Sequence, residues 1–290
     1  MKFSHPKSSE LPFAVGVPAL LWQILFFYIP LLIIICTSFF IYSDQKLSFT
    51  LEKLYIFFNA TYIRVIFSSV LLGLSNAVLC FCIAYPLAYF MAFRARKIKN
   101  ILLFLLLIPF WTNFLLHVYA WFFVLERNGF LNNLLQTLGI ISEPIAFMNS
   151  IFATMIMMVY YYLPFMVLPI YTSLEKFDYK LIEASVDLGA SWLHTFTKII
   201  LPLTLRGIRA GFFLVYIPSF GEFAIPELMG GDKMMFVGSV VARYILGDQT
   251  GSLGAAFTVV SCGVLFISSL FLFYFITKIF TLRGSRGIKN

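Results

Sequence analysis

The segment "KLIEASVDLGASWLHTFTKIILPLT", residues 180–204, is the one long stretch of this chain that is neither a membrane span nor a simple turn. It is charged at its start and amphipathic in its middle, and it ends on a proline inside an apolar run. A connection between two membrane helices needs only a few polar residues. The organisation of this segment therefore indicates a task of its own.

The pattern predicts two short helices, one on each side of Gly189, where a helix can reverse through a left-handed residue. Asp178 can cap the first helix. The second helix is expected at about 191–200, with Pro202 ending it. On the first helix two faces are expected, an inner one of Leu181, Ala184, Ser185 and Leu188 and an outer one of Glu183 and Asp187. Such an elbow can dock on a soluble partner or lie on lipid headgroups without one, and the pattern alone favours neither.

The composition requires a bilayer around the rest of the chain. The 290 residues are 61% hydrophobic, 19% aromatic and only 12% charged, with a mean hydropathy of +0.92. A soluble domain is about half apolar and roughly a quarter charged. The four cysteines lie in apolar runs, which argues against a disulfide framework, and the three scattered histidines offer no metal site.

Six apolar runs are long enough to cross a bilayer as helices, each with about 20 residues. They are expected at 13–40, 65–93, 101–125, 151–174, 207–226 and 255–280, so that 13–280 forms one all-α membrane domain between the tails 1–12 and 281–290. Most of the 21 lysines and arginines fall in the two tails, in 94–100 and in 175–209. By the positive-inside rule, both tails and the elbow are cytoplasmic. The net charge of +8 is thus a topology signal, and no nucleic-acid partner is expected.

A resemblance sharpens the elbow's role. The segment resembles the cytoplasmic signature of permease subunits of binding-protein-dependent ABC importers, written E-A-A-x3-G-x9-I-x-L-P. Every spacing fits, and the one departure is a serine in place of the alanine at the third position. The matching residues are Glu183, Ala184, Ser185, Gly189, Ile199, Leu201 and Pro202, with Asp187 between them. The resemblance implies that the elbow, within 178–204, couples the membrane domain to an ATPase and that the fold is the type I importer fold.

Three further segments resemble the spermidine/putrescine importer permeases, specifically the B-type subunit. They are "LLFLLLIPFWTNFLLHVYAW" (102–121), "YYYLPFMVLPIYTSLEKFDYKLIEASVDLGAS" (160–191) and "PSFGEFAIPELMGG" (218–231), and the likeness covers about 60–280. It implies a second related permease, two cytoplasmic ATPase subunits and a periplasmic or lipid-anchored polyamine receptor. ATP and Mg²⁺ would bind to the ATPase subunits, and this chain itself would bind no cofactor. Related permeases carry iron(III), opines or other small solutes.

Candidate residues for a cation path are few. Glu222 follows Pro218 and Gly221, which break the fifth run. If Glu222 lies at membrane depth, its ionisable side chain indicates function. If the span ends near Phe220, Glu222 lies among the outer headgroups. Aromatic faces can hold ammonium groups, although such residues are more often interfacial or packed. The expected path residues are Trp111, Asn113, Tyr160, Glu222, Glu227 and Asp232.

Two other classes of protein are possible. A self-sufficient secondary transporter usually has inverted repeats and charges buried inside its spans, and neither is evident. A membrane-bound enzyme would need clustered His, Asp or Glu near one membrane face. No phosphate-binding loop is present, because "GGDK" (230–233) has neither the spacing nor the Ser or Thr of that motif. The chain is therefore expected to be a transport subunit without its own ATPase.

Overall fold

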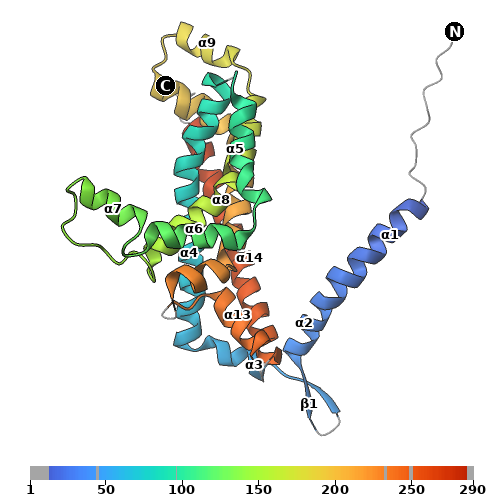
Figure 1. Ribbon diagram of the computed structural model, residues 1–290. Helices are drawn as coiled ribbons and strands as arrows, with labels where there is room; N and C mark the ends of the chain where they lie inside the picture. The colour runs from blue at the N-terminus through green and yellow to red at the C-terminus, as the bar shows by residue number, and fades with distance from the viewer. Residues whose placement is uncertain (1–12, 44–45, 96, 232–233, 248–250, 286–290) are drawn as a thin grey trace, which may run out of the picture. The chain divides into compact units, whose positions relative to one another are not determined.

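The computed structural model describes residues 13–43, 46–95, 97–231, 234–247 and 251–285 (Figure 1). It divides into two compact units, which are described separately. The first consists of the described residues within Met1–Asn59 and Val241–Val260, and the second of those within Ala60–Val240 and Ser261–Asn290.

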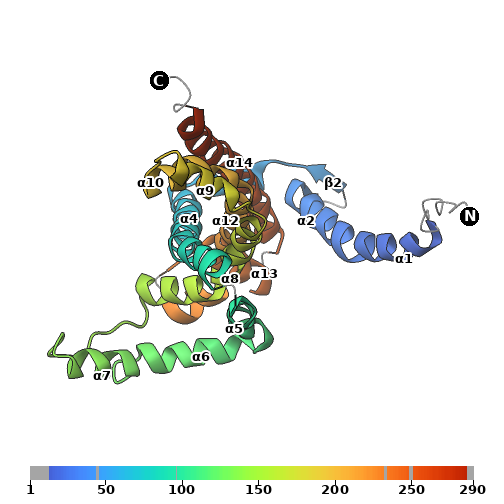
Figure 2. The ribbon, with the colours of Figure 1, turned by 90° about the horizontal axis from the view of Figure 1, so that it is seen from above.

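Three long helices form the body of the second unit: α4 (Ala60–Tyr89), α8 (Ile151–Glu175) and α12 (Leu205–Phe220). They pack against one another in pairs and lie together when seen end-on (Figure 2). Small residues allow the backbones to approach closely. A Cβ at Gly207 of α12 would overlap the Pro169 carbonyl and the Ser173 side chain of α8.

Polar side chains pin these helices together inside the apolar core. Asn76 Nδ2 of α4 donates to Ser219 Oγ of α12 over 2.8 Å, and both side chains are fully buried. Tyr216 of α12 lies 2.7 Å, hydroxyl to hydroxyl, from Ser268 of α14 (Gly251–Ser285). In a medium without water such bonds satisfy groups that would otherwise be left unpaired.

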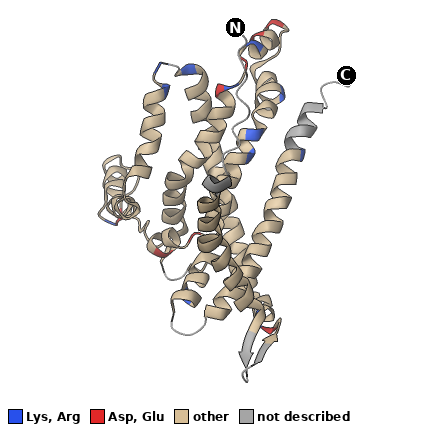
Figure 3. Ribbon diagram, turned by 90° about the vertical axis from the view of Figure 1, so that its right-hand side faces the viewer, with Lys and Arg blue, Asp and Glu red and all other residues tan. Residues whose placement is uncertain are grey.

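Among the residues that the structure describes, four helices are long and apolar enough to span a membrane: Val17–Phe39, Ala60–Arg94, Ile151–Glu175 and Gly251–Lys278. Two bent helix pairs raise this to six if each pair is one span. Charged residues gather toward the helix ends (Figure 3), and 65–93 and 151–174 contain none.

The run at 101–125, which was expected to cross the membrane as a helix, is not one continuous helix. The chain forms α5 (Lys99–Trp111), α6 (Phe114–Leu125) and α7 (Phe130–Thr137), with a bend of 99° after Trp111. Asn113 is extended, and its Oδ1 accepts the N–H of Leu115 over 2.8 Å, so it caps α6. Asn113 thus starts a new helix in a new direction.

The expected fifth span, 207–226, is also shorter than predicted. Its helix α12 ends at Phe220, and a separate π-helical turn, η5, covers Pro226–Gly230. At its start, α12 is bent by 67° from the preceding helix Trp192–Leu203.

The first unit contains a helix of three consecutive segments: α1 (Phe13–Gln23), η1 (Ile24–Tyr28) and α2 (Ile29–Phe39). A small antiparallel hairpin follows, in which β1 (Phe40–Ser43) pairs with β2 (Lys46–Phe49), Phe40 opposite Phe49. This hairpin corrects the all-α expectation. The unit also holds α3 (Glu52–Tyr55), η2 (Ile56–Phe58) and part of α13 (Val237–Leu246). Phe57 is buried against the rings of Tyr244 and Phe257.

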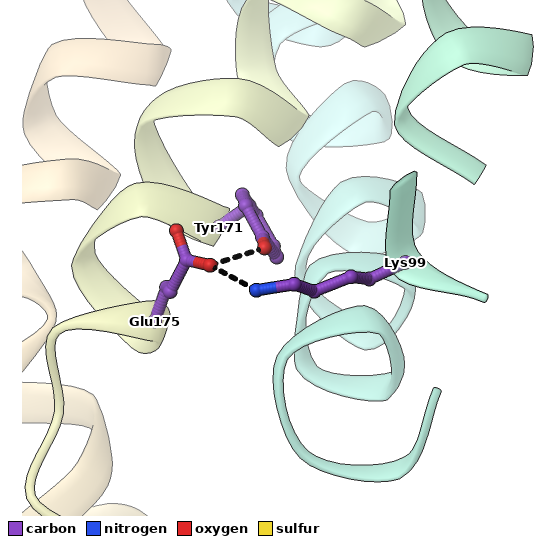
Figure 4. Close-up of polar contacts among 3 residues, drawn as sticks. All are labelled: Lys99, Tyr171 and Glu175. Atoms are coloured by element: carbon purple, nitrogen blue, oxygen red, sulfur yellow. Dashed lines mark hydrogen bonds and ion pairs between the residues drawn. The ribbon is translucent and has the colours of Figure 1, made fainter. Parts of the chain in front are cut away.

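A surface ion pair joins the start of α5 to the end of α8. Lys99 Nζ lies 2.7 Å from Glu175 Oε1, which also accepts the Tyr171 hydroxyl over 2.8 Å (Figure 4). Because both charged side chains are partly exposed, the pair contributes at most about 1 kcal/mol. The Glu175 carboxylate is thus engaged by both Lys99 and Tyr171.

Candidate functional site

The first helix of the elbow, α9 (Lys180–Asp187), ends as its sequence predicts. Gly189 has a φ of 77° and therefore occupies the left-handed region. Its N–H donates to the Val186 carbonyl over 2.8 Å, and the N–H of Ala190 donates to the Ser185 carbonyl over 3.0 Å. These two bonds are a Schellman motif, which satisfies the last carbonyls of α9 and reverses the chain. At the other end, Asp178 Oδ1 accepts the N–H of Lys180.

The second helix continues further than expected. It consists of α10 (Trp192–Thr195), the π-helical segment η4 (Phe196–Ile200) and α11 (Leu201–Leu203), so Pro202 does not end it. Proline has no N–H to give to the helix and clashes with the carbonyl four residues back. The wider turn of η4 lies directly before Pro202 and accommodates it. Leu201 is buried and Ile199 is half-buried.

A hydrogen bond joins the two helices of the elbow. Ser185 Oγ lies 2.8 Å from Thr195 Oγ1, and both residues are buried. Ser185 Oγ also donates to the Ile182 carbonyl over 2.8 Å. Ser185 stands where the signature has an alanine at its third position. The sequence offered no signal for Thr195, because its partner is ten positions away on another helix.

Aromatic rings attach the elbow to the body. Tyr85 and Tyr89 lie one turn apart on α4 and meet the rings of Phe196 and Trp192 at centroid distances of 5.5 and 5.6 Å. One turn further, on η3 (Phe90–Arg94), Phe93 meets Tyr179 at 5.9 Å. We call this set the aromatic ladder. Its spacing of four residues along 85–93 was visible in the sequence but was not recognised as a site.

The inner face of α9 differs from the expected one. Ile182 and Ser185 are buried, whereas Leu181, Ala184 and Leu188 are exposed, so the expected inner face of four residues is wrong except for Ser185. Glu183 and Asp187 are exposed, as predicted. The outer surface of the elbow therefore combines two carboxylates with large apolar side chains. Those exposed apolar residues are Leu181, Val186, Leu188, Trp192 and Leu193.

The candidates on α5, α6 and α8 form one polar cluster at the 99° bend. Tyr160 Oη lies 2.9 Å from His117 Nδ1. The other ring nitrogen of His117 lies 3.0 Å from the Pro109 carbonyl and also contacts Thr112 Oγ1. Asn113 is engaged as the cap of α6, and Trp111 is 75% exposed. Tyr160 and Asn113 therefore stabilise the bend, and Trp111 is the member whose ring is available to another molecule.

Glu222 forms a second cluster just beyond the end of α12. Its Oε2 accepts the Tyr162 hydroxyl over 2.6 Å, and its Oε1 accepts the N–H of Ala224 over 3.0 Å. The side chain is half-buried. Glu227 on η5 is exposed, and Asp232 lies outside the described residues. Tyr160 and Tyr162 differ by about 200° around α8, so the two clusters lie on different sides of that helix.

Comparison with known proteins gives a family for this chain. The family model described as binding-protein-dependent transport system inner membrane component matches residues 84–284. The spermidine/putrescine transport system permease protein PotB of Escherichia coli K12 is 42% identical over 81% of this chain and 86% of its own length. PotB of Haemophilus influenzae is 37% identical over 88% of this chain and 89% of its own length.

Solved structures share the fold at low sequence identity. A bacterial ABC transporter that imports the acidic polysaccharide alginate contains a chain with a TM-score of 0.73 and 15% identity, covering 92% of this chain and 95% of that one. The same kind of transporter in complex with an alginate-bound periplasmic protein gives a TM-score of 0.73 at 16% identity.

Proposed function

This chain belongs to the family of inner membrane components of binding-protein-dependent transport systems, and we propose that it is the permease subunit of an ATP-driven polyamine importer. It is a multi-pass protein of the bacterial cytoplasmic membrane. The family is one of transport subunits rather than enzymes. The proposed cargo is spermidine or putrescine, supported by 37–42% identity to the permeases named for these solutes.

The proposed topology has six spans and cytoplasmic termini. It takes each bent helix pair as one span and follows the excess of Lys and Arg in 94–100 and 175–209. This orientation makes the elbow cytoplasmic. The proposed partners are a second related permease, two ATPase subunits that hold ATP and Mg²⁺, and a solute receptor on the opposite side. The chain itself would bind no cofactor.

In this proposal the elbow seats in the ATPase. The observation that carries it is the outer surface of α9, where Glu183 and Asp187 lie beside exposed Val186 and Leu188. An apolar patch with two like charges is unfavourable in water but suits a groove with basic residues at its rim. The aromatic ladder then carries the motion of the elbow into α4, and the 67° bend at Thr204 carries it into α12.

Two variants test the elbow, one at its turn and one on its charged face. Gly189→Asp places a side chain on a left-handed backbone, and Glu183→Lys reverses one exposed charge. Both are expected to abolish co-purification of the cognate ATPase and polyamine uptake while membrane insertion is retained. Glu126→Lys is the matched control, because it reverses an exposed charge near the end of α6, away from the elbow. If the ATPase still co-purifies with both elbow variants, the docking role is wrong.

A further inference from the structure

A cavity at the base of the elbow has no part in the transport function proposed above. It has a volume of about 320 Å³ and lies between the end of α8, the start of α9 and the junction of α11 with α12. Its polar lining comes from Ser173, Lys176, Asp178 and Arg206. Two positively charged side chains thus face one small space from the two ends of the elbow.

The nearby carboxylates offset the charge of these cations only in part. Glu175, the neighbour of Lys176, is paired with Lys99 and accepts the Tyr171 hydroxyl (Figure 4). Asp178 also lines the cavity and keeps its negative charge, since its Oδ1 accepts only the backbone N–H of Lys180, over 3.1 Å. The two cations therefore outnumber the one carboxylate in the lining. Within the described part of the chain, neither Lys176 nor Arg206 has an ion pair. Two like charges at one cavity repel each other, and an anion between them would remove that repulsion.

The rest of the lining is apolar: Phe177, Leu181 and Leu203. Leu181 and Leu203 are 44% and 56% exposed. A small soluble anion gains nothing from such walls, whereas a lipid has a charged phosphate and an acyl chain joined together. Basic pockets at the cytoplasmic side of membrane helices are typical sites for anionic lipid headgroups. A polyamine would be repelled by Lys176 and Arg206, so the cavity is not a binding site for the cargo.

We propose that this cavity binds the phosphate group of an anionic phospholipid of the cytoplasmic leaflet, held between Lys176 and Arg206. The proposal rests on the cytoplasmic placement of the elbow given above. The bound phosphate would join the two ends of the elbow, because Lys176 lies two residues before it and Arg206 two residues after it. Lipid composition would then set how firmly the elbow is held against the body.

The test measures binding to the full chain alone, in detergent, and needs neither ATPase nor polyamine. Thermal unfolding is followed while dioctanoyl phosphatidylglycerol, dioctanoyl phosphatidylcholine or inorganic phosphate is added, since a ligand of the folded state raises Tm. Phosphatidylglycerol is expected to raise Tm more than phosphatidylcholine. Lys176→Gln and Arg206→Gln are each expected to weaken its binding about fivefold, and the double variant roughly 25-fold.

Lys97→Gln is the matched control, because it removes an exposed positive charge from the same side of the chain outside the cavity. It is expected to bind phosphatidylglycerol as the parent does. The proposal would be overturned if both lipids raised Tm equally. It would also be overturned if phosphatidylglycerol raised the Tm of the double variant as much as that of the parent, provided that the two have the same Tm without lipid. A shift with inorganic phosphate that the double variant loses would keep the anion site but overturn its assignment to a lipid. None of these outcomes depends on whether the chain transports polyamines.

Discussion

Ser185 Oγ of α9 lies 2.8 Å from Thr195 Oγ1 of α10, and this contact closes the elbow on itself. It occurs at the one position where the chain departs from the family signature. An alanine there would fill the space but could not reach Thr195. At the position where the signature has alanine, this chain thus has a buried hydrogen bond between the two short helices.

Ser185→Ala is expected to destabilise the protein more than removal of both hydroxyls. The single change leaves buried Thr195 Oγ1 without its partner, at a cost of about 1–3 kcal/mol. Adding Thr195→Val removes that unpaired group and is expected to restore most of the lost stability. Thermal unfolding of the parent, both single variants and the double variant completes the cycle. Additive losses would show that the two hydroxyls are not coupled.

Gly189→Ala isolates the backbone conformation of the turn. No atom lies within 4 Å of the added Cβ, so the expected cost of about 1–2 kcal/mol comes from the φ of 77° alone. Gly139→Ala is a matched control, with a φ of 68° and equally open space. Both variants are expected to lose similar stability, but only Gly189→Ala should weaken pull-down of the ATPase. Equal weakening by both would assign the effect to stability rather than to the elbow.

Gly207→Ala tests the close packing of α12 on α8. The added methyl group would overlap the Pro169 carbonyl and the Ser173 side chain, so the helices must separate. We expect a loss of about 1–3 kcal/mol and a lower yield of folded protein in detergent. Gly263→Ala places the same methyl group in open space on α14 and is expected to be neutral or stabilising by up to about 1 kcal/mol. Similar unfolding curves for the two variants would contradict the close approach.

Glu222 offers a test of the cargo path that separates charge from structure. Glu222→Gln removes the charge but keeps an oxygen that can accept the N–H of Ala224. If the carboxylate contacts the cation, KM for spermidine uptake should rise several-fold. Tyr162→Phe is the control, because it removes the 2.6 Å hydrogen bond and leaves the charge in place. A rise in KM with Tyr162→Phe but not with Glu222→Gln would make Glu222 a structural residue.

The elbow shows what sequence spacing can predict. Gly189 and the two helices around it follow from local rules, and the structure confirms both. Pro202 was expected to end the second helix, but a π-helical segment accommodates it. The inner face of α9 was misjudged because Ile182, not Leu181, turns toward the body. Periodicity places residues on a shared face, but the surrounding packing decides which face is buried.

The membrane helices show where local rules fail. Pro109 is a local reason for a break in 101–125, but nothing local gives the 99° change of direction. Tyr160 is predicted to line a path, and this stays a prediction; its contact with His117 at that bend had no signal in the sequence. Asn76 and Ser219 are 143 positions apart, so their buried hydrogen bond follows from the packing of α4 on α12. The hairpin at 40–49 was hidden because the residues before it continue an apolar run.

The most direct test of the account is reconstitution of this chain into proteoliposomes with its partner permease, receptor and ATPase. Labelled spermidine uptake is measured with ATP, with a non-hydrolysable analogue, and with the ATPase left out. Uptake is expected only when ATP and the complete set are present, and it should disappear with Gly189→Asp in the elbow. Spermidine uptake by this chain without any ATPase would contradict the central claim.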